Sequence, residues 1–135
     1  MKKILLTGIS GQCGSTLARY LLEIGGYEIY GMMRRSSNPN TDRIHDILDK
    51  ITIVSGDLAD QVSLQHAVKI ANPDIVVNLG AQSFVHVSWT MPLLTADITG
   101  LGALRLLEAV RLIKPDARFI QASSSEMMGG MKDGE

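Results

Sequence analysis

The chain has 135 residues, of which 45% are hydrophobic and 20% are charged, and its net charge is -1. No block of Lys and Arg is long enough to form a basic face, so we expect neither a nucleic acid nor an anionic membrane as partner. No apolar run approaches the roughly 20 residues that a bilayer span needs. The single cysteine, Cys13, excludes an internal disulfide and a multi-cysteine zinc site. We therefore expect one globular domain with a cytoplasmic location.

Five apolar runs of strand length recur along the chain, each bounded by Gly, Pro, Asp or Asn. The predicted strands are Ile4–Leu6, Tyr27–Met32, Ile51–Val54, Ile75–Leu79 and Arg118–Gln121. Three stretches between them have helical periodicity, with apolar residues three or four positions apart. Their periodic residues are Leu17, Tyr20, Leu21 and Ile24, then Leu64, Ala67, Val68 and Ala71, then Ala103, Leu106, Leu107 and Val110. A weaker helical pattern covers Thr41–Lys50.

Strands and helices therefore alternate regularly along the chain. The run "DIVVNL" (residues 74–79) is almost continuously apolar, which is typical of a strand covered on both faces. Pro73 and Pro115 end the second and third predicted helices just before the next strand. We predict an α/β fold, a Rossmann-type doubly wound parallel sheet of about five strands with right-handed crossovers.

A glycine-rich turn, "TGISGQCG" (residues 7–14), follows the first predicted strand and opens the first predicted helix. Glycine permits a sharp turn, lets backbone N–H groups approach a pyrophosphate and lets the helix pack closely on the sheet. The anion would lie at the positive end of the helix. The alternative is a tight turn without a ligand, but the position between strand and helix favours nucleotide binding.

The residues after the second strand indicate which nicotinamide cofactor is preferred. An acidic residue there would pair with the ribose 2′-OH of NAD, whereas a basic one accommodates the 2′-phosphate of NADP. The chain has Arg34, Arg35 and Ser36 at this point and no carboxylate before Asp42. These residues favour NADP, the alternative being a pair of solvated arginines.

Polar residues also follow the later strands. Asp57 and Leu58, after the third strand, could bracket an adenine ring or simply form a turn and helix cap. Ser123, Ser124 and Glu126 follow the fifth strand, where hydroxyls can bind a sugar and a carboxylate can act as acid or base. A serine-rich loop with one Glu is by itself also typical of an ordinary turn.

Other residues with chemical potential are not assigned to a site. His45, His66 and His86 are scattered, without the spacing of a metal pair, so no metal is predicted. We expect Phe84 and Trp89 to pack in the core or at an interface.

The motifs "TGISGQCGSTLARYLL", "RRSS", "GDLAD", "NLGAQSFV" and "QASSSEMMG" carry a family likeness. The first resembles the glycine turn of the extended short-chain dehydrogenase/reductases. Taken together they resemble the N-terminal part of the GDP-mannose 4,6-dehydratases, over essentially all 135 residues. The resemblance implies an NADP-dependent lyase that converts GDP-mannose to GDP-4-keto-6-deoxymannose, with hydride taken from C4 and returned to C6. It also implies a dimer or tetramer.

The resemblance implies roles for individual residues. Ser124 falls at the position of the catalytic Thr or Ser, and Glu126 at that of the base for the C5 proton. Ser83, with these two residues, lies on the substrate side. The residues expected to bind NADP are Thr7, Gly8, Gly11, Gln12, Gly14, Arg34, Arg35, Ser36, Asp57, Leu58, Leu79, Ala81 and Ser123.

The chain departs from the family pattern at two important points. It has no Tyr-x-x-x-Lys motif, because residues four positions after Tyr20, Tyr27 and Tyr30 are Ile, Gly and Arg. A C-terminal substrate domain is also absent, so we expect residues 1–135 to be an incomplete NADP-binding Rossmann domain without turnover of its own. Two alternatives remain open: another nucleotide-sugar epimerase or reductase of the extended family, and a non-catalytic NADP-sensing module.

Overall fold

A computed structural model describes residues 1–130, apart from the side chain of Glu126. No helix in this range is long and apolar enough to cross a membrane. Helices and strands follow one another in the order β1 (Lys2–Thr7), α1 (Gln12–Ile24), β2 (Tyr27–Met33), η1 (His45–Ile47), β3 (Thr52–Ser55), α2 (Gln61–Ala71), β4 (Ile75–Asn78), α3 (Val85–Thr90), α4 (Pro92–Thr95), η2 (Ala96–Leu101), α5 (Gly102–Ile113), β5 (Arg118–Gln121) and η3 (Ser125–Met128).

The five strands form one parallel sheet in the order β3-β2-β1-β4-β5. In the central register, Leu5 of β1 pairs with Tyr30 of β2 on one side and with Val76 of β4 on the other. The chain moves outward from β1 through β2 to β3, then crosses back to β4 on the opposite side of β1. This reversal confirms the predicted doubly wound Rossmann-type fold and places a topological switch point between β1 and β4.

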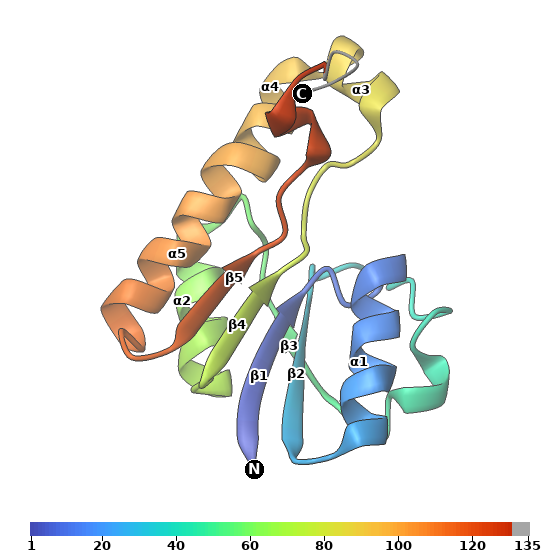
Figure 1. Cartoon of the computed structure of the whole chain (residues 1–135), viewed down its shortest axis with the longest axis vertical. Coiled ribbons are helices and arrows are strands. Elements are labelled where there is room, and N and C mark those ends of the chain that lie inside the picture. The colour runs from blue at the N-terminus through green and yellow to red at the C-terminus, as the bar shows by residue number, and fades with distance from the viewer. Residues whose placement is uncertain (131–135) are drawn as a thin grey trace.

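Alternate residues of β1 supply the two halves of the core, because successive side chains of a strand point to opposite faces. Leu5 packs in the cluster that includes Leu64 of α2 and Leu106 of α5. Ile4 and Leu6 pack in the other cluster, with Ala18 and Leu21 of α1 among its members. Figure 1 shows the same division, with α1 on one side of the sheet and α2 and α5 on the other.

The segment predicted as a weak helix, Thr41–Lys50, does not form a regular α-helix. It makes successive three-residue turns, in which the N–H of Ile44 bonds to the carbonyl of Thr41 and that of Ile47 to the carbonyl of Ile44. Only His45–Ile47 is helical, as the single 3₁₀ turn η1. Three-residue spacing stacks Ile44 and Ile47 on one side, and both are buried against the α1 face of the sheet. Burial of these two residues therefore decides the local structure.

The segment between β4 and α5 folds into short helices that the sequence did not predict. Here α3, α4 and η2 lead into α5, and Figure 1 shows α3 and α4 beyond the carboxyl ends of the strands. Phe84 and Trp89 are 66% and 82% exposed, so the expectation that they pack in the core is wrong. The alternative, an interface, stays a prediction.

The packing of α5 on α2 makes a direct test of the core. Leu106 is fully buried, whereas Leu104 of the same helix is 58% exposed. Leu106→Ala should lower the free energy of unfolding by about 2–5 kcal/mol, because it removes apolar contacts and leaves a cavity. Leu104→Ala, the same change at an exposed position, should cost much less. Urea denaturation of both variants measures the difference, and equal losses would contradict this packing.

Candidate functional site

The predicted site residues follow the ends of all five strands. Because the strands are parallel, their carboxyl ends lie along one edge of the sheet, where open α/β sheets bind ligands. The glycine turn follows β1, the arginines follow β2, and Asp57 follows β3 at this edge. Figure 1 shows the chain leaving β4 and β5 there and continuing toward α3 and η3.

The glycine turn is packed too closely to accept side chains. Gly8 has a φ of 65°, a conformation that favours glycine, and a Cβ there would lie 3.0 Å from the backbone of Leu79. The N–H of Gly11 donates to the carbonyl of Gly8 at 3.0 Å. A Cβ on Gly14 would lie 2.2 Å from the same carbonyl oxygen. A Cβ on Gly11 would also approach this oxygen, at 3.2 Å. The close contacts of the three glycines together bring the start of α1 onto the end of β1.

The N-terminus of α1 is left open. Its N-cap, Gly11, has no side chain to accept from the first backbone N–H groups, and its first turn, which begins at the exposed Gln12, contains no acidic residue. The contrast with α2 is direct, since the carboxylate of Asp60 caps that helix by accepting from the N–H groups of Val62 and Ser63. N–H groups without a capping side chain among the described residues, together with the helix dipole, favour an anion at the start of α1.

A polar ladder that sequence reasoning missed joins the ends of β1, β4 and β5. The buried hydroxyl of Thr7 donates to Oδ1 of Asn78 at 2.5 Å and accepts from the N–H groups of Leu79 and Gly80 at 3.1 and 2.9 Å. Nδ2 of Asn78 donates to Oε1 of Gln121 at 2.8 Å. The sequence did contain a signal for this ladder, because each of the three apolar strands ends in a polar residue: Thr7, Asn78 and Gln121. The ladder fixes the backbone on which Leu79 and its neighbours lie.

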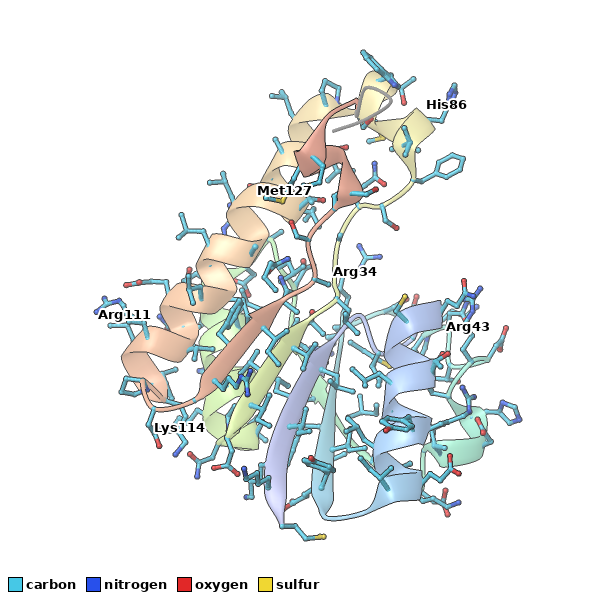
Figure 2. The ribbon with its side chains drawn as sticks, viewed as in Figure 1. Arg34, Arg43, His86, Arg111, Lys114 and Met127 are labelled. Atoms are coloured by element: carbon cyan, nitrogen blue, oxygen red, sulfur yellow. The ribbon has the colours of Figure 1, made fainter. Side chains whose placement is uncertain are left out.

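The arginine segment after β2 lies open to solvent. Arg34, Arg35 and Ser36 are all exposed, and neither guanidinium has an ion-pair partner among the described side chains. The hydroxyl of Ser36 accepts from the N–H of Asn38 at 3.2 Å. Figure 2 shows Arg34 at the carboxyl edge of the sheet. Two arginines without ion-pair partners in the described part of the chain are therefore available to an anionic ligand.

The residues after β3 serve the local turn. Oδ1 of Asp57 accepts from the N–H of Ala59 at 2.9 Å, which fixes a short turn before Asp60 caps α2. Leu58 is only 6% exposed, and a Cβ on Gly80 would meet its side chain at 2.9 Å. Leu58 thus packs in the core beneath the chain that leaves β4. The turn that we considered as an alternative is present, and the adenine contact stays a prediction.

The segments after β4 and β5 carry the residues expected on the sugar side. Leu79 is partly buried, whereas Ala81 and Ser83 are exposed. Ser123 and Ser124 are also exposed, and the hydroxyl of Ser123 donates to the sulfur of Met127.

The structure leaves the side chain of one expected catalytic residue undescribed and brings no metal ligands together among the residues it describes. Glu126 belongs to the turn η3, but its side chain lies outside the described residues. No three His, Cys, Asp or Glu side chains in the described part of the chain converge on a point that could hold a metal.

Gly14→Ala tests the close contact of α1 with the turn. Its Cβ would lie 2.2 Å from the Gly8 oxygen, a backbone atom that cannot move without shifting the turn. We expect a loss of stability of about 1–3 kcal/mol or more, as for other overpacked sites. Gly100→Ala is the matched control, because its Cβ would meet no atom within 4 Å. Thermal unfolding compares them, and a neutral Gly14→Ala would contradict the contact.

Thr7→Val tests the polar ladder. The change preserves the shape of the side chain but leaves the N–H groups of Leu79 and Gly80 and the Asn78 amide without their buried partner. Each unsatisfied buried group costs about 1–3 kcal/mol. Thr7→Ser, which keeps the hydroxyl, should lose less stability than Thr7→Val in urea denaturation. A larger loss for Thr7→Ser would show that packing of the methyl group, and not the hydrogen bonds of the hydroxyl, stabilises this part of the fold.

The structure is similar to solved nucleotide-sugar enzymes. The UDP-glucose 4-epimerase of Thermus thermophilus, solved in complex with NAD, matches with a TM-score of 0.84 and 27% identity over 98% of this chain and 41% of its own. The dTDP-glucose 4,6-dehydratase of Bacillus anthracis, also in complex with NAD, matches with a TM-score of 0.82 and 25% identity over 100% of this chain and 41% of its own.

Sequence comparison identifies a narrower group. GDP-mannose 4,6-dehydratase of Yersinia enterocolitica is 49% identical over 96% of this chain and 37% of its own length. The enzymes named GDP-mannose 4,6 dehydratase 1 of Arabidopsis thaliana and GDP-mannose 4,6 dehydratase of Homo sapiens are 47% and 41% identical, and this chain spans 38% and 37% of their lengths. The family model described as GDP-mannose 4,6 dehydratase matches residues 5–135, so the chain belongs to the GDP-mannose 4,6-dehydratase family.

Proposed function

We propose that this chain binds NADP along the glycine turn and is the cofactor-binding part of an enzyme that converts GDP-mannose to GDP-4-keto-6-deoxymannose. The observation that carries the proposal is the open N-terminus of α1, held by Gly14 against the carbonyl of Gly8. Family membership supports the reaction, and the NAD complexes of the Thermus and Bacillus enzymes support a nicotinamide cofactor at this fold.

The pyrophosphate of NADP would lie against the start of α1. Thr7, Gly8 and Gly11 form the turn. The N–H groups of Gln12 and its neighbours, which no described side chain caps, would donate to the phosphate oxygens. At its glycines the turn has no Cβ that would hold a phosphate away from the backbone. The lack of an acidic residue in the first turn of α1 also removes a source of repulsion.

The 2′-phosphate would lie against the segment after β2. Arg34 and Arg35 are exposed, without ion-pair partners in the described part of the chain, and a guanidinium binds a phosphate in a two-pronged geometry. The hydroxyl of Ser36 adds a donor. NAD has no 2′-phosphate, so these residues would prefer NADP. Asp57 and Leu58 remain the proposed residues on the adenine side, and Leu79, Ala81 and Ser123 those beside the ribose and nicotinamide.

The sugar would lie beyond the ends of β4 and β5. Bound NADP supplies an acceptor for hydride and later its donor. Ser83 and Ser124 would hold hydroxyl groups of the sugar, and Glu126 would remove the proton at C5, which a neighbouring ketone makes acidic. Ser83 and Ser124 are exposed, which leaves room for a ligand beside them.

A second candidate function is sugar epimerisation. The likeness to a UDP-glucose 4-epimerase solved in complex with NAD, at a TM-score of 0.84, favours it. The two differ at C5, since dehydration needs a base there and a simple 4-epimerisation does not. Glu126 is therefore the residue that separates them.

The cellular location and the oligomeric state are also proposed. We infer a cytoplasmic enzyme that works as a dimer or tetramer. Large exposed apolar residues on α3 and α4, such as Trp89 and Leu93, support burial against another polypeptide.

Parallel calorimetric titrations with NADP and NAD test the proposed function. We expect tighter binding of NADP, and Arg35→Ala should reduce NADP affinity about tenfold or more while leaving NAD affinity unchanged, because only NADP presents a 2′-phosphate. Arg111→Ala is the matched control, since Arg111 pairs with Glu108 on α5, away from the carboxyl edge (Figure 2). Equal binding of both cofactors, or binding of neither, would overturn the proposal for this chain.

A further inference from the structure

The arginine segment, residues 34–43, is fixed at its two ends. At its start, Met33 is the last residue of β2 and its carbonyl accepts from the N–H of Gly56 at 3.0 Å. At its end, Ile44 is fully buried among residues of the α1 face of the sheet. Figure 2 shows Arg34 at the carboxyl edge of the sheet and Arg43 beside α1. The segment thus spans from one to the other.

Between these ends the segment has little support of its own. Its internal bonds include those from the N–H of Asn38 to the Ser36 hydroxyl and from the N–H of Asp42 to Oδ1 of Asn40, both 3.2 Å long. Nearly all of its residues are exposed. Such a loop takes its conformation from its anchors, because local bonds of this length restrain it weakly.

One side chain, Arg19 of α1, ties the far end of this segment to the helix. Its guanidinium donates from Nε and Nη2 to the two carboxylate oxygens of Asp46 at 2.9 and 2.7 Å. Nη2 also donates to the carbonyl of Arg43 at 2.5 Å, and Nη1 to the carbonyl of Ser15 at 3.3 Å. A single planar group therefore joins the helix that follows the glycine turn to the last residue of the arginine segment.

The pair formed by Arg19 and Asp46, which we call the clamp, remains charged at neutral pH. Hydrogen bonding to Arg19 lowers the pKa of the Asp46 carboxyl from 3.8 to about 2. The two side chains are 41% and 44% exposed, and ion pairs as exposed as this contribute little to global stability. What the clamp can do is restrict the conformations of the loop, and restricting a binding loop in advance raises affinity by lowering the cost of ordering it.

We propose that Arg19, held by Asp46, is a positioning residue for cofactor selectivity: it fixes the arginine segment so that Arg34 and Arg35 face the 2′-phosphate. The inference rests on the proposed NADP site and adds to it a residue on a different element. Arg19 does not contact the cofactor in this scheme. It acts through the segment, so its removal should affect NADP and spare NAD.

Arg19→Leu tests the proposal through two readouts. Calorimetry with NADP and with NAD should show the NADP preference falling about threefold to tenfold with NAD affinity unchanged. Hydrogen exchange of the cofactor-free protein should be faster for amides 34–43 and unchanged in β1. Arg111→Leu, which breaks an exposed ion pair on α5, is the control and should change neither.

A double-mutant cycle separates positioning from a general loss of structure. In an Arg34→Ala, Arg35→Ala background, Arg19→Leu should have little further effect on the NADP preference, because the two guanidinium groups that Arg19 positions are gone. A preference that depends on Arg35 but survives Arg19→Leu, or loop exchange that is unchanged, would overturn this inference and leave the proposed function intact. An equal loss of NAD affinity would also overturn it. A wild-type protein without any NADP preference would instead refute the proposed function.

Discussion

The contact between the start of α1 and the carbonyl of Gly8 is the constraint on which the rest of the site depends. A Cβ on Gly14 would come within 2.2 Å of that oxygen, so only glycine lets the helix begin there. The same turn lies against the chain leaving β4, where the Thr7 hydroxyl binds the N–H groups of Leu79 and Gly80. The close packing of α1, the glycine turn and the chain that leaves β4 therefore fixes the switch point of the sheet. It also fixes the place where a ligand can bind.

Two of the helices that begin along this edge, α1 and α2, differ in how their first N–H groups are satisfied. Asp60 satisfies the first N–H groups of α2 with its own carboxylate, as a helix without a ligand would be expected to do. The start of α1 has no such cap, and the arginines after β2 have no ion-pair partners within the described residues. Donors and positive charge are thus left available at two points of one edge. A dinucleotide with a 2′-phosphate carries anionic groups that fit both, which links the fold to the proposed cofactor.

Sequence reasoning worked where the signal is local. The five strands were predicted because each is a short apolar run ended by a breaker, and the glycine turn because its spacing follows directly from the geometry of a strand-to-helix connection. It failed where tertiary contacts decide. The helical pattern of Thr41–Lys50 gave way to three-residue turns because Ile44 and Ile47 are buried together. The Thr7 ladder joins residues 71 and 43 positions apart, and the clamp on Asp46 comes from a helix 27 positions away. Sequence patterns are searched over short stretches of the chain, and residues so far apart never fall within one such stretch.

The most direct measurement is a two-dimensional NMR titration of the ¹⁵N-labelled chain with NADP. The largest chemical-shift changes should appear at the amides of residues 8–14 and 34–36, which follow different strands. The chemical shifts of the amides of α5 near Arg111 should not change. Shifts at both segments that saturate together would show one ligand lying across the glycine turn and the arginines. No shift at millimolar NADP, or shifts that avoid the glycine turn, would contradict a dinucleotide site at the start of α1.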